Sequence, residues 1–169
     1  TMSVGKTTLV KALKKLPEFK KYNFATERSK YLNDLGIPLN TDSTLKGQTV
    51  FLAERCAELM NNNIITDRTV IDVMAFTMNA KSIGHYDKEI FESYAKEFIR
   101  EYDYIFYISP HGIPMEDNGV RETDEHYRDI IDFTITTLIK KYGHMANKIE
   151  KISGSTDERV EQILKFTNL

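Results

Sequence analysis

Short apolar segments alternate with longer amphipathic segments along almost the whole of this 169-residue sequence. The short segments have the length and composition of buried strands, and the longer ones carry apolar residues at the three- and four-residue spacing of helices. Such alternation is typical of strand–helix–strand units whose parallel sheet is covered by helices on both faces. The pattern therefore predicts one α/β domain spanning residues 1–169.

The boundaries of these segments follow from where the patterns begin and end. Pro17 stops the first expected helix, and Gly36 closes the second. Strands are expected at residues 22–26, 64–67, 104–108 and 149–152, and helices at 5–16, 29–35, 47–61, 68–81, 87–100, 124–141 and from residue 155 or 156 onward.

Composition excludes several classes of protein. The sequence has 23 basic and 25 acidic residues, which argues against a nucleic-acid binder held mainly by counterion release, although a local basic groove stays possible. Its single cysteine, Cys56, excludes a disulfide framework and suits a reducing cytoplasm. No apolar run approaches the roughly 20 residues that span a bilayer. We therefore expect a cytoplasmic protein whose partner is a small molecule and which does not bind a membrane.

The first eight residues match the end of the phosphate-binding P-loop, written G-x-x-x-x-G-K-[ST]. Gly5 allows the backbone to turn around phosphate oxygens, Lys6 reaches the β- and γ-phosphates, and the Thr7 hydroxyl ligates Mg²⁺. A P-loop begins with a glycine and follows a buried strand. We therefore expect that glycine immediately before Thr1 and a strand before the glycine. An ordinary helix start is the alternative interpretation. The residues expected to bind ATP here are Thr1, Met2, Ser3, Val4, Gly5, Lys6, Thr7 and Thr8.

Charged residues follow the expected strand at 64–67, where ligands bind in open parallel sheets. Asp67 is expected to hold Mg²⁺ opposite Thr7, and a helix cap is the alternative. Arg68 is a candidate for clamping the acceptor or the transferred phosphoryl group, because guanidinium binds phosphate through two parallel hydrogen bonds. An ion pair with Asp67 or Asp72 is the alternative for Arg68.

Three further residues are candidates for the acceptor site. Glu27 follows the expected strand at 22–26 and could accept a proton from an acceptor hydroxyl, hold a sugar hydroxyl, or serve as an ion-pair partner or helix cap. Arg28 beside it is a candidate for binding the acceptor. Gln48 begins a helix and is interpreted either as an acceptor ligand or as a first-turn surface residue.

The polar loop at about residues 111–128 is expected to form a lid over ATP. Arg121 and Arg128 would bring positive charge to the transition state, with ordinary solvation as the alternative for Arg128. Gly154 and Ser155 follow the last strand, where the backbone could approach an adenine. A plain strand-to-helix turn would have the same sequence.

The order of these motifs resembles that of the P-loop nucleoside and nucleotide kinases. It reads G-K-T-T, E-R, Q, D-R, D-x-G-V-R and G-S, and is most similar to the AAA-type branch typified by the ribosylnicotinamide kinase domain of the bifunctional NAD-salvage regulator and its phage-encoded relatives. The resemblance implies a parallel five-stranded sheet flanked by helices, with the first strand missing from this sequence. It also implies ATP and Mg²⁺ as cofactors, and a host cytoplasm if the protein is phage-encoded.

The resemblance and the strand-end residues together predict phosphoryl transfer to a hydroxyl of a small nucleoside-like acceptor such as nicotinamide riboside. One alternative is a nucleoside monophosphate kinase of the thymidylate or deoxynucleotide type, in which Arg28 and Arg68 hold the acceptor phosphate. A second is an NTP-binding regulatory or interaction protein. The acceptor and the oligomeric state stay open. The expected catalytic residues are Lys6, Glu27, Asp67, Arg68 and Arg121.

Overall fold

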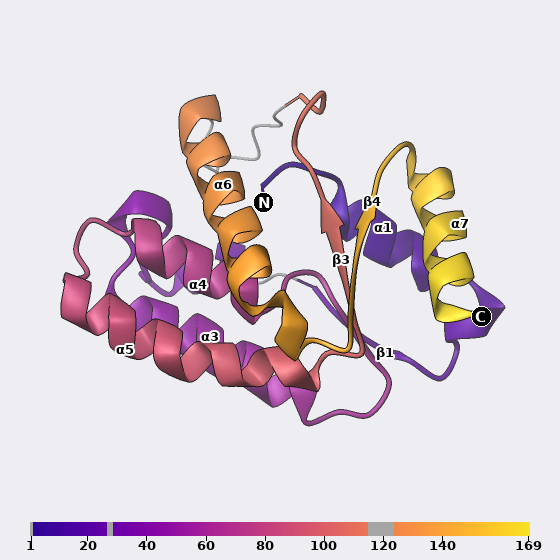
Figure 1. Ribbon diagram of the computed structural model, residues 1–169, viewed down its shortest axis with the longest axis horizontal. Coiled ribbons are helices and arrows are strands. Elements are labelled where there is room, and N and C mark those ends of the chain that lie inside the picture. Colours follow the sequence, from indigo (N-terminus) through magenta and orange to yellow (C-terminus); the bar gives the residue numbers. More distant parts are fainter. Residues whose placement is uncertain (1, 27–28, 115–123) are drawn as a thin grey trace.

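The computed structural model describes residues 2–26, 29–114 and 124–169, and it has the predicted alternation of strands and helices (Figure 1). Short 3₁₀ segments lie at Pro17–Phe19, Asn40–Asp42, Lys96–Glu101 and Gly143–Met145. The strands are β1 (Asn23–Ala25), β2 (Ile64–Thr66), β3 (Tyr104–Ile108) and β4 (Lys148–Ile152), and the helices are α1 (Lys6–Leu13), α2 (Ser29–Asp34), α3 (Leu45–Leu59), α4 (Val70–Asn79), α5 (His85–Ala95), α6 (Glu125–Tyr142) and α7 (Thr156–Thr167).

Side-chain caps set several helix starts. The Thr44 hydroxyl accepts from the backbone N–H of Gly47, so α3 begins two residues earlier than predicted. Thr69 and Asp72 form a reciprocal capping box at the start of α4. The alternative interpretation of Asp67 as the cap of this helix is therefore wrong.

The strands form two separate parallel pairs, whereas one five-stranded sheet was expected. β1 pairs with β2 in the register Asn23↔Ile64, and β3 pairs with β4 in the register Tyr104↔Lys148. Within the described ranges, β2 and β3 each pair on one side only. Both line a single cleft of about 710 Å³, so these edges face the same space.

Helices cover the strands on two sides. Helices α3 to α6 pack together on one side of β3, and α1 and α7 lie side by side on the other (Figure 1). Strand β3 joins the two apolar cores, because Ile105 is buried with the first group and Ile108 with the second. Fully burying such a side chain stabilises the fold by about 1.5–3 kcal/mol.

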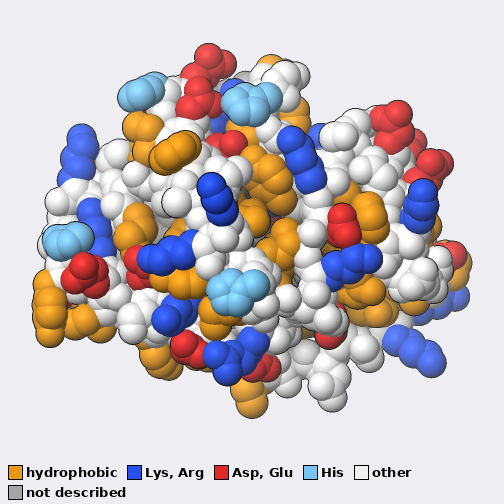
Figure 2. All heavy atoms as spheres, viewed as in Figure 1, with side chains coloured by type: hydrophobic (Ala, Val, Ile, Leu, Met, Phe, Trp, Pro, Cys, Tyr) orange, Lys and Arg blue, Asp and Glu red, His pale blue; other side chains and the backbone are white. Residues whose placement is uncertain are grey.

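The surface in view mixes charges of both signs. Figure 2 shows basic and acidic side chains interspersed over this face, which agrees with the balanced net charge. This face therefore does not present the one-signed field that draws in a nucleic-acid backbone. Among the described helices, none combines the length and apolar character needed to cross a bilayer.

Candidate functional site

The loop before α1 has the backbone conformation of an anion-binding turn. Ser3 and Gly5 both have left-handed φ angles, of 52° and 77°, and Gly5 is the N-cap of α1. The side chains of Met2 and Val4 are buried in the two apolar cores and anchor the loop. The loop therefore offers a ligand its backbone N–H groups and the positive end of α1, as the glycine-lysine-threonine motif predicts.

Thr7 and Asp67, which are 60 residues apart in the sequence, meet at the end of this loop. The Thr7 hydroxyl donates a hydrogen bond to Oδ2 of Asp67. Asp67 is only 2% exposed, and its Oδ1 is buried with no hydrogen-bond partner among the described residues. A buried acceptor without a partner costs about 1–3 kcal/mol, so this oxygen is suited to a ligand that arrives later.

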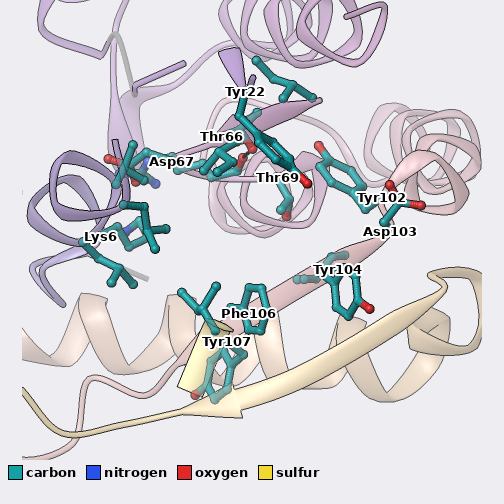
Figure 3. Close-up of a pocket in the computed structure, with 18 of the residues that line it drawn as sticks. Lys6, Tyr22, Thr66, Asp67, Thr69, Tyr102, Asp103, Tyr104, Phe106 and Tyr107 are labelled. Carbon is teal, nitrogen blue, oxygen red and sulfur yellow. Dashed lines mark hydrogen bonds between the residues drawn. The ribbon is translucent and has the colours of Figure 1, made fainter. Parts of the chain in front are cut away.

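The donor atoms of this pair fit a magnesium ion. A carboxylate oxygen and a hydroxyl oxygen are the hard ligands that Mg²⁺ prefers, and the ion usually keeps several waters and adds phosphate oxygens. Lys6 and Asp67 both line the cleft (Figure 3), so a cation and the carboxylate predicted to bind the metal lie in the same cavity. The structure thus brings together Lys6, Thr7 and Asp67, the predicted centre of the site.

Arg68 has a strained backbone at the end of β2. Its φ of 110° lies in the left-handed region, and the Thr66 hydroxyl donates to its carbonyl at 2.7 Å. The guanidinium lies 5.2 Å from the ring centre of Phe76 and 3.9 Å from the Asp72 carboxylate. The ion pair with Asp72 is therefore confirmed, and the clamp on a phosphoryl group stays a prediction.

Asp72 is a carboxylate held in its charged form by nearby cations. Burial raises the pKa of Asp72, and the positive charges of Arg68 and Lys6 and the backbone N–H of Thr69 lower it. The Asp72 carboxylate therefore places a negative charge beside Arg68. The sequence alone indicates Asp72 only as an alternative ion-pair partner of Arg68.

A second, smaller pocket adjoins Arg68. Gln48 is 3% exposed and lines it, so its interpretation as a surface residue is wrong. Phe51 lies one turn along α3 from Gln48, and Phe76 one turn along α4 from Asp72, a spacing that could have identified both aromatic residues. The pocket is lined by Met2, Ser29, Leu39, Asn40, Ser43, Gln48, Phe51, Arg68, Asp72, Val73 and Phe76.

Arg128 belongs to the interior. It is 7% exposed in the first turns of α6, and its Nη1 donates to the carbonyl of Ile113 at 2.8 Å. Its interpretation as an ordinary solvated charge is therefore wrong, while its role over ATP stays a prediction. The contact joins the two ends of the expected lid, because Ile113 lies near its start and Arg128 at its end.

Local geometry accounts for the turn after β4. Gly154 has a φ of 93°, and a Cβ there would lie 2.4 Å from the Glu158 carboxylate. Ser155 caps α7 in a box with Glu158. The strand-to-helix turn therefore explains both residues, and an approach to adenine stays a prediction.

Four of the predicted site residues lie outside the described part of the chain. They are Thr1, Glu27, Arg28 and Arg121, and residues 115–123 of the expected lid fall there too. Their roles stay predictions.

Comparisons with known proteins bear on the family and the fold. A family model described as an AAA domain matches residues 1–159. A solved structure, described as deoxyadenosine kinase from M. mycoides with bound dCTP, superposes with a TM-score of 0.68 over 99% of this chain and 95% of that chain, at 17% sequence identity. At that identity the likeness shows a shared fold. No curated protein sequence gives a significant match.

Proposed function

The chain belongs to the AAA domain family, and from that premise we propose that it is a nucleoside kinase that transfers the γ-phosphoryl group of ATP to a nucleoside hydroxyl. The observation that carries the proposal is the pairing of Thr7 with the buried Asp67 at the end of the P-loop. The pairing supports phosphate and metal binding because it leaves one buried carboxylate oxygen without a partner among the described residues.

At the phosphate end, the backbone N–H groups of the loop and the N-terminus of α1 bind the phosphate oxygens, and Lys6 neutralises their charge. Thr7 and Asp67 hold Mg²⁺, which when bound neutralises phosphate charge and orients the transferred group. Catalysis by these residues consists of positioning and electrostatic stabilisation, with Arg121 proposed to add charge from the lid.

At the acceptor end, Arg68 connects the two cavities, because it lines both the cleft beside Lys6 and the pocket beside Gln48. Gln48 offers amide donors and acceptors to a base edge, and Phe76 offers a flat apolar face. The pocket holds about 50 Å³, which is room for one or two waters, so a nucleoside base has to widen it on binding.

The charge on Asp72 favours a nucleoside over a monophosphate as the acceptor. Its carboxylate already pairs with Arg68, and the positive charges of Arg68 and Lys6 favour its negative form. The phosphate of a nucleoside monophosphate entering this pocket would be repelled by that negative charge. Glu27 is proposed as the general base that removes the hydroxyl proton.

An acceptor screen tests the proposal. The purified chain, with any residues that precede Thr1 retained, is incubated with ATP, Mg²⁺ and deoxyadenosine, other nucleosides, nicotinamide riboside and nucleoside monophosphates. Mass spectrometry then identifies the acceptor that gains one phosphate, and Lys6→Ala serves as the inactive control. Deoxyadenosine is the first candidate, since it is the substrate in the name of the kinase that shares the fold. A gain on a monophosphate, or ATP binding with no modified acceptor, contradicts the proposal.

We also infer that the two parallel pairs are halves of one five-stranded sheet. The open edges of β2 and β3 line the same cleft, and the P-loop residues Val4 and Lys6 line it as well (Figure 3). A parallel strand between them would satisfy both edges and lead into the P-loop. The backbone N–H groups of Thr66 and Tyr107 point away from the partner strands by strand alternation, so slow hydrogen exchange at both amides is expected in a chain that retains any residues preceding Thr1. Rapid exchange at both would contradict the inference.

A further inference from the structure

Arg159 extends from α7 to the backbone of the P-loop. The side chain is only 8% exposed, and its Nη1 donates a hydrogen bond of 2.6 Å to the carbonyl oxygen of Val4, 155 residues away in the sequence. The same nitrogen lies 3.4 Å from where a Cβ on Gly5 would stand. The guanidinium therefore lies directly behind the peptide that joins Val4 to Gly5.

This contact determines which way that peptide faces. In a trans peptide the C=O and the following N–H point in opposite directions. With the Val4 carbonyl held toward α7, the N–H of Gly5 points away from α7. Rotation of this peptide changes ψ of Val4 and φ of Gly5. Gly5 has a left-handed φ of 77°, and glycine adopts other φ values readily, so the peptide has the freedom to rotate. A rotated peptide would turn a carbonyl oxygen toward any bound anion.

The position of Arg159 is unfavourable for stability in two respects. A cation beside the N-cap of α1 faces the positive end of that helix dipole. In addition, Nε of Arg159 is buried without a hydrogen-bond partner in the described part of the chain. Local conflicts of this kind are expected where a residue serves a ligand. An anion bound at the loop would relieve the first of them.

We propose that Arg159 is a positioning residue that locks the Val4–Gly5 peptide with the Gly5 N–H directed toward the phosphates of ATP. The inference rests on the proposed function of the P-loop. Arg159 acts through the loop backbone, and α7 packs beside α1, so the C-terminal helix keeps the phosphate site in its binding conformation before ligand arrives (Figure 1).

The test compares the binding of MgATP and of magnesium tripolyphosphate, which carries the phosphate chain alone. Arg159→Gln removes the charged donor and is expected to weaken both ligands by the same factor, about tenfold, as for loss of one charge-assisted hydrogen bond. Lys165→Gln is the matched control, because it removes one positive charge from an exposed position further along α7. It should bind both ligands as the unmodified chain does.

A spectroscopic measurement separates positioning from a general loss of stability. The amide resonance of Gly5 is expected to shift when tripolyphosphate is added to the unmodified chain, and to shift much less in Arg159→Gln. Arg159→Lys keeps the charge, but its shorter chain and lack of a planar fork should lose the bond to Val4 and weaken both ligands too. This variant also serves if Arg159→Gln does not fold.

Each outcome is decisive. If either Arg159 variant binds both ligands as tightly as the unmodified chain, the proposed lock is wrong and the P-loop assignment stands. The lock is also wrong if the variants lose thermal stability alone, with unchanged affinity. If the unmodified chain binds neither MgATP nor tripolyphosphate, the proposed function fails first, and the lock fails with it.

Discussion

Replacing Asp67 with asparagine should raise the stability of the unliganded protein while removing its response to MgATP. The carboxylate is 2% exposed, accepts one hydrogen bond from Thr7, and has its Oδ1 buried without a partner among the described residues. An amide at this position can still accept from Thr7, and it carries no charge. It has little to offer Mg²⁺, however, because the negative oxygen is gone.

The magnitude follows from that single orphaned oxygen. Leaving a buried acceptor unsatisfied costs about 1–3 kcal/mol, and more when the group is charged. An uncharged amide recovers only the part that is due to the charge, because its NH₂ donors also lack partners. We therefore expect a gain of about 1 kcal/mol, or about 2–4 °C in the melting temperature of a domain of this size. MgATP at a hundred times its Kd should stabilise the unmodified protein by about 2.7 kcal/mol.

Scanning calorimetry with and without MgATP measures both effects. Asp103→Asn is the matched control, because Asp103 lines the same cleft but is exposed. It should leave both the melting temperature and the MgATP response unchanged. A clear fall in the melting temperature of unliganded Asp67→Asn would refute the reasoning about the orphaned oxygen. A full MgATP response in that variant would refute the metal role.

Three further predictions concern the acceptor, the proton and the core. Gln48→Leu should raise the KM for the acceptor by about tenfold or more, because a buried hydrogen-bonding group is lost from the acceptor pocket. The KM for ATP should change little, and steady-state kinetics with each substrate varied in turn measures both values. Glu27→Gln should lower kcat by about 10²–10⁴-fold while ATP affinity is unchanged, and an undiminished kcat would exclude the base role. Burial and the hydrogen bond to Asp132 raise the pKa of Tyr107 from 10.0 to about 12, so its contribution to stability is complete below pH 10 and is lost as the pH rises toward 12. In Tyr107→Phe, chemical unfolding at several pH values should show a flatter dependence over that window.

Local sequence signals predicted most of the elements and the centre of the phosphate site. The apolar run from Tyr104 to Ile108 is β3 with both ends as expected, because a short run of branched and aromatic residues between an aspartate and a Ser-Pro pair has few other conformations. The expected helix at 5–16 ends at Leu13, and Pro17 begins a 3₁₀ turn instead. Helix ends depend on single hydrogen bonds, which periodicity does not encode.

The acceptor side of the site was less predictable from the sequence. Gln48 looks like a first-turn polar residue, yet it is buried and lines a pocket with residues of α4, against which α3 packs. Arg68 could be predicted to pair with Asp72, but its left-handed backbone and its contact with Phe76 could not. These features depend on how one helix lies on another, which is a property of the packed core.

By itself, the sequence determined the α/β class and the order of the elements, because both follow from the periodicity of apolar residues. It also placed a phosphate-binding lysine and threonine at the start of a helix, because that motif consists of residues adjacent in the chain. Only the tertiary structure decided that Thr7 meets Asp67, that β2 and β3 expose facing edges to one cleft, and that Arg159 lies behind Val4. Such contacts join residues far apart in the chain. They form only when the cores bring distant segments together, and no local pattern records them.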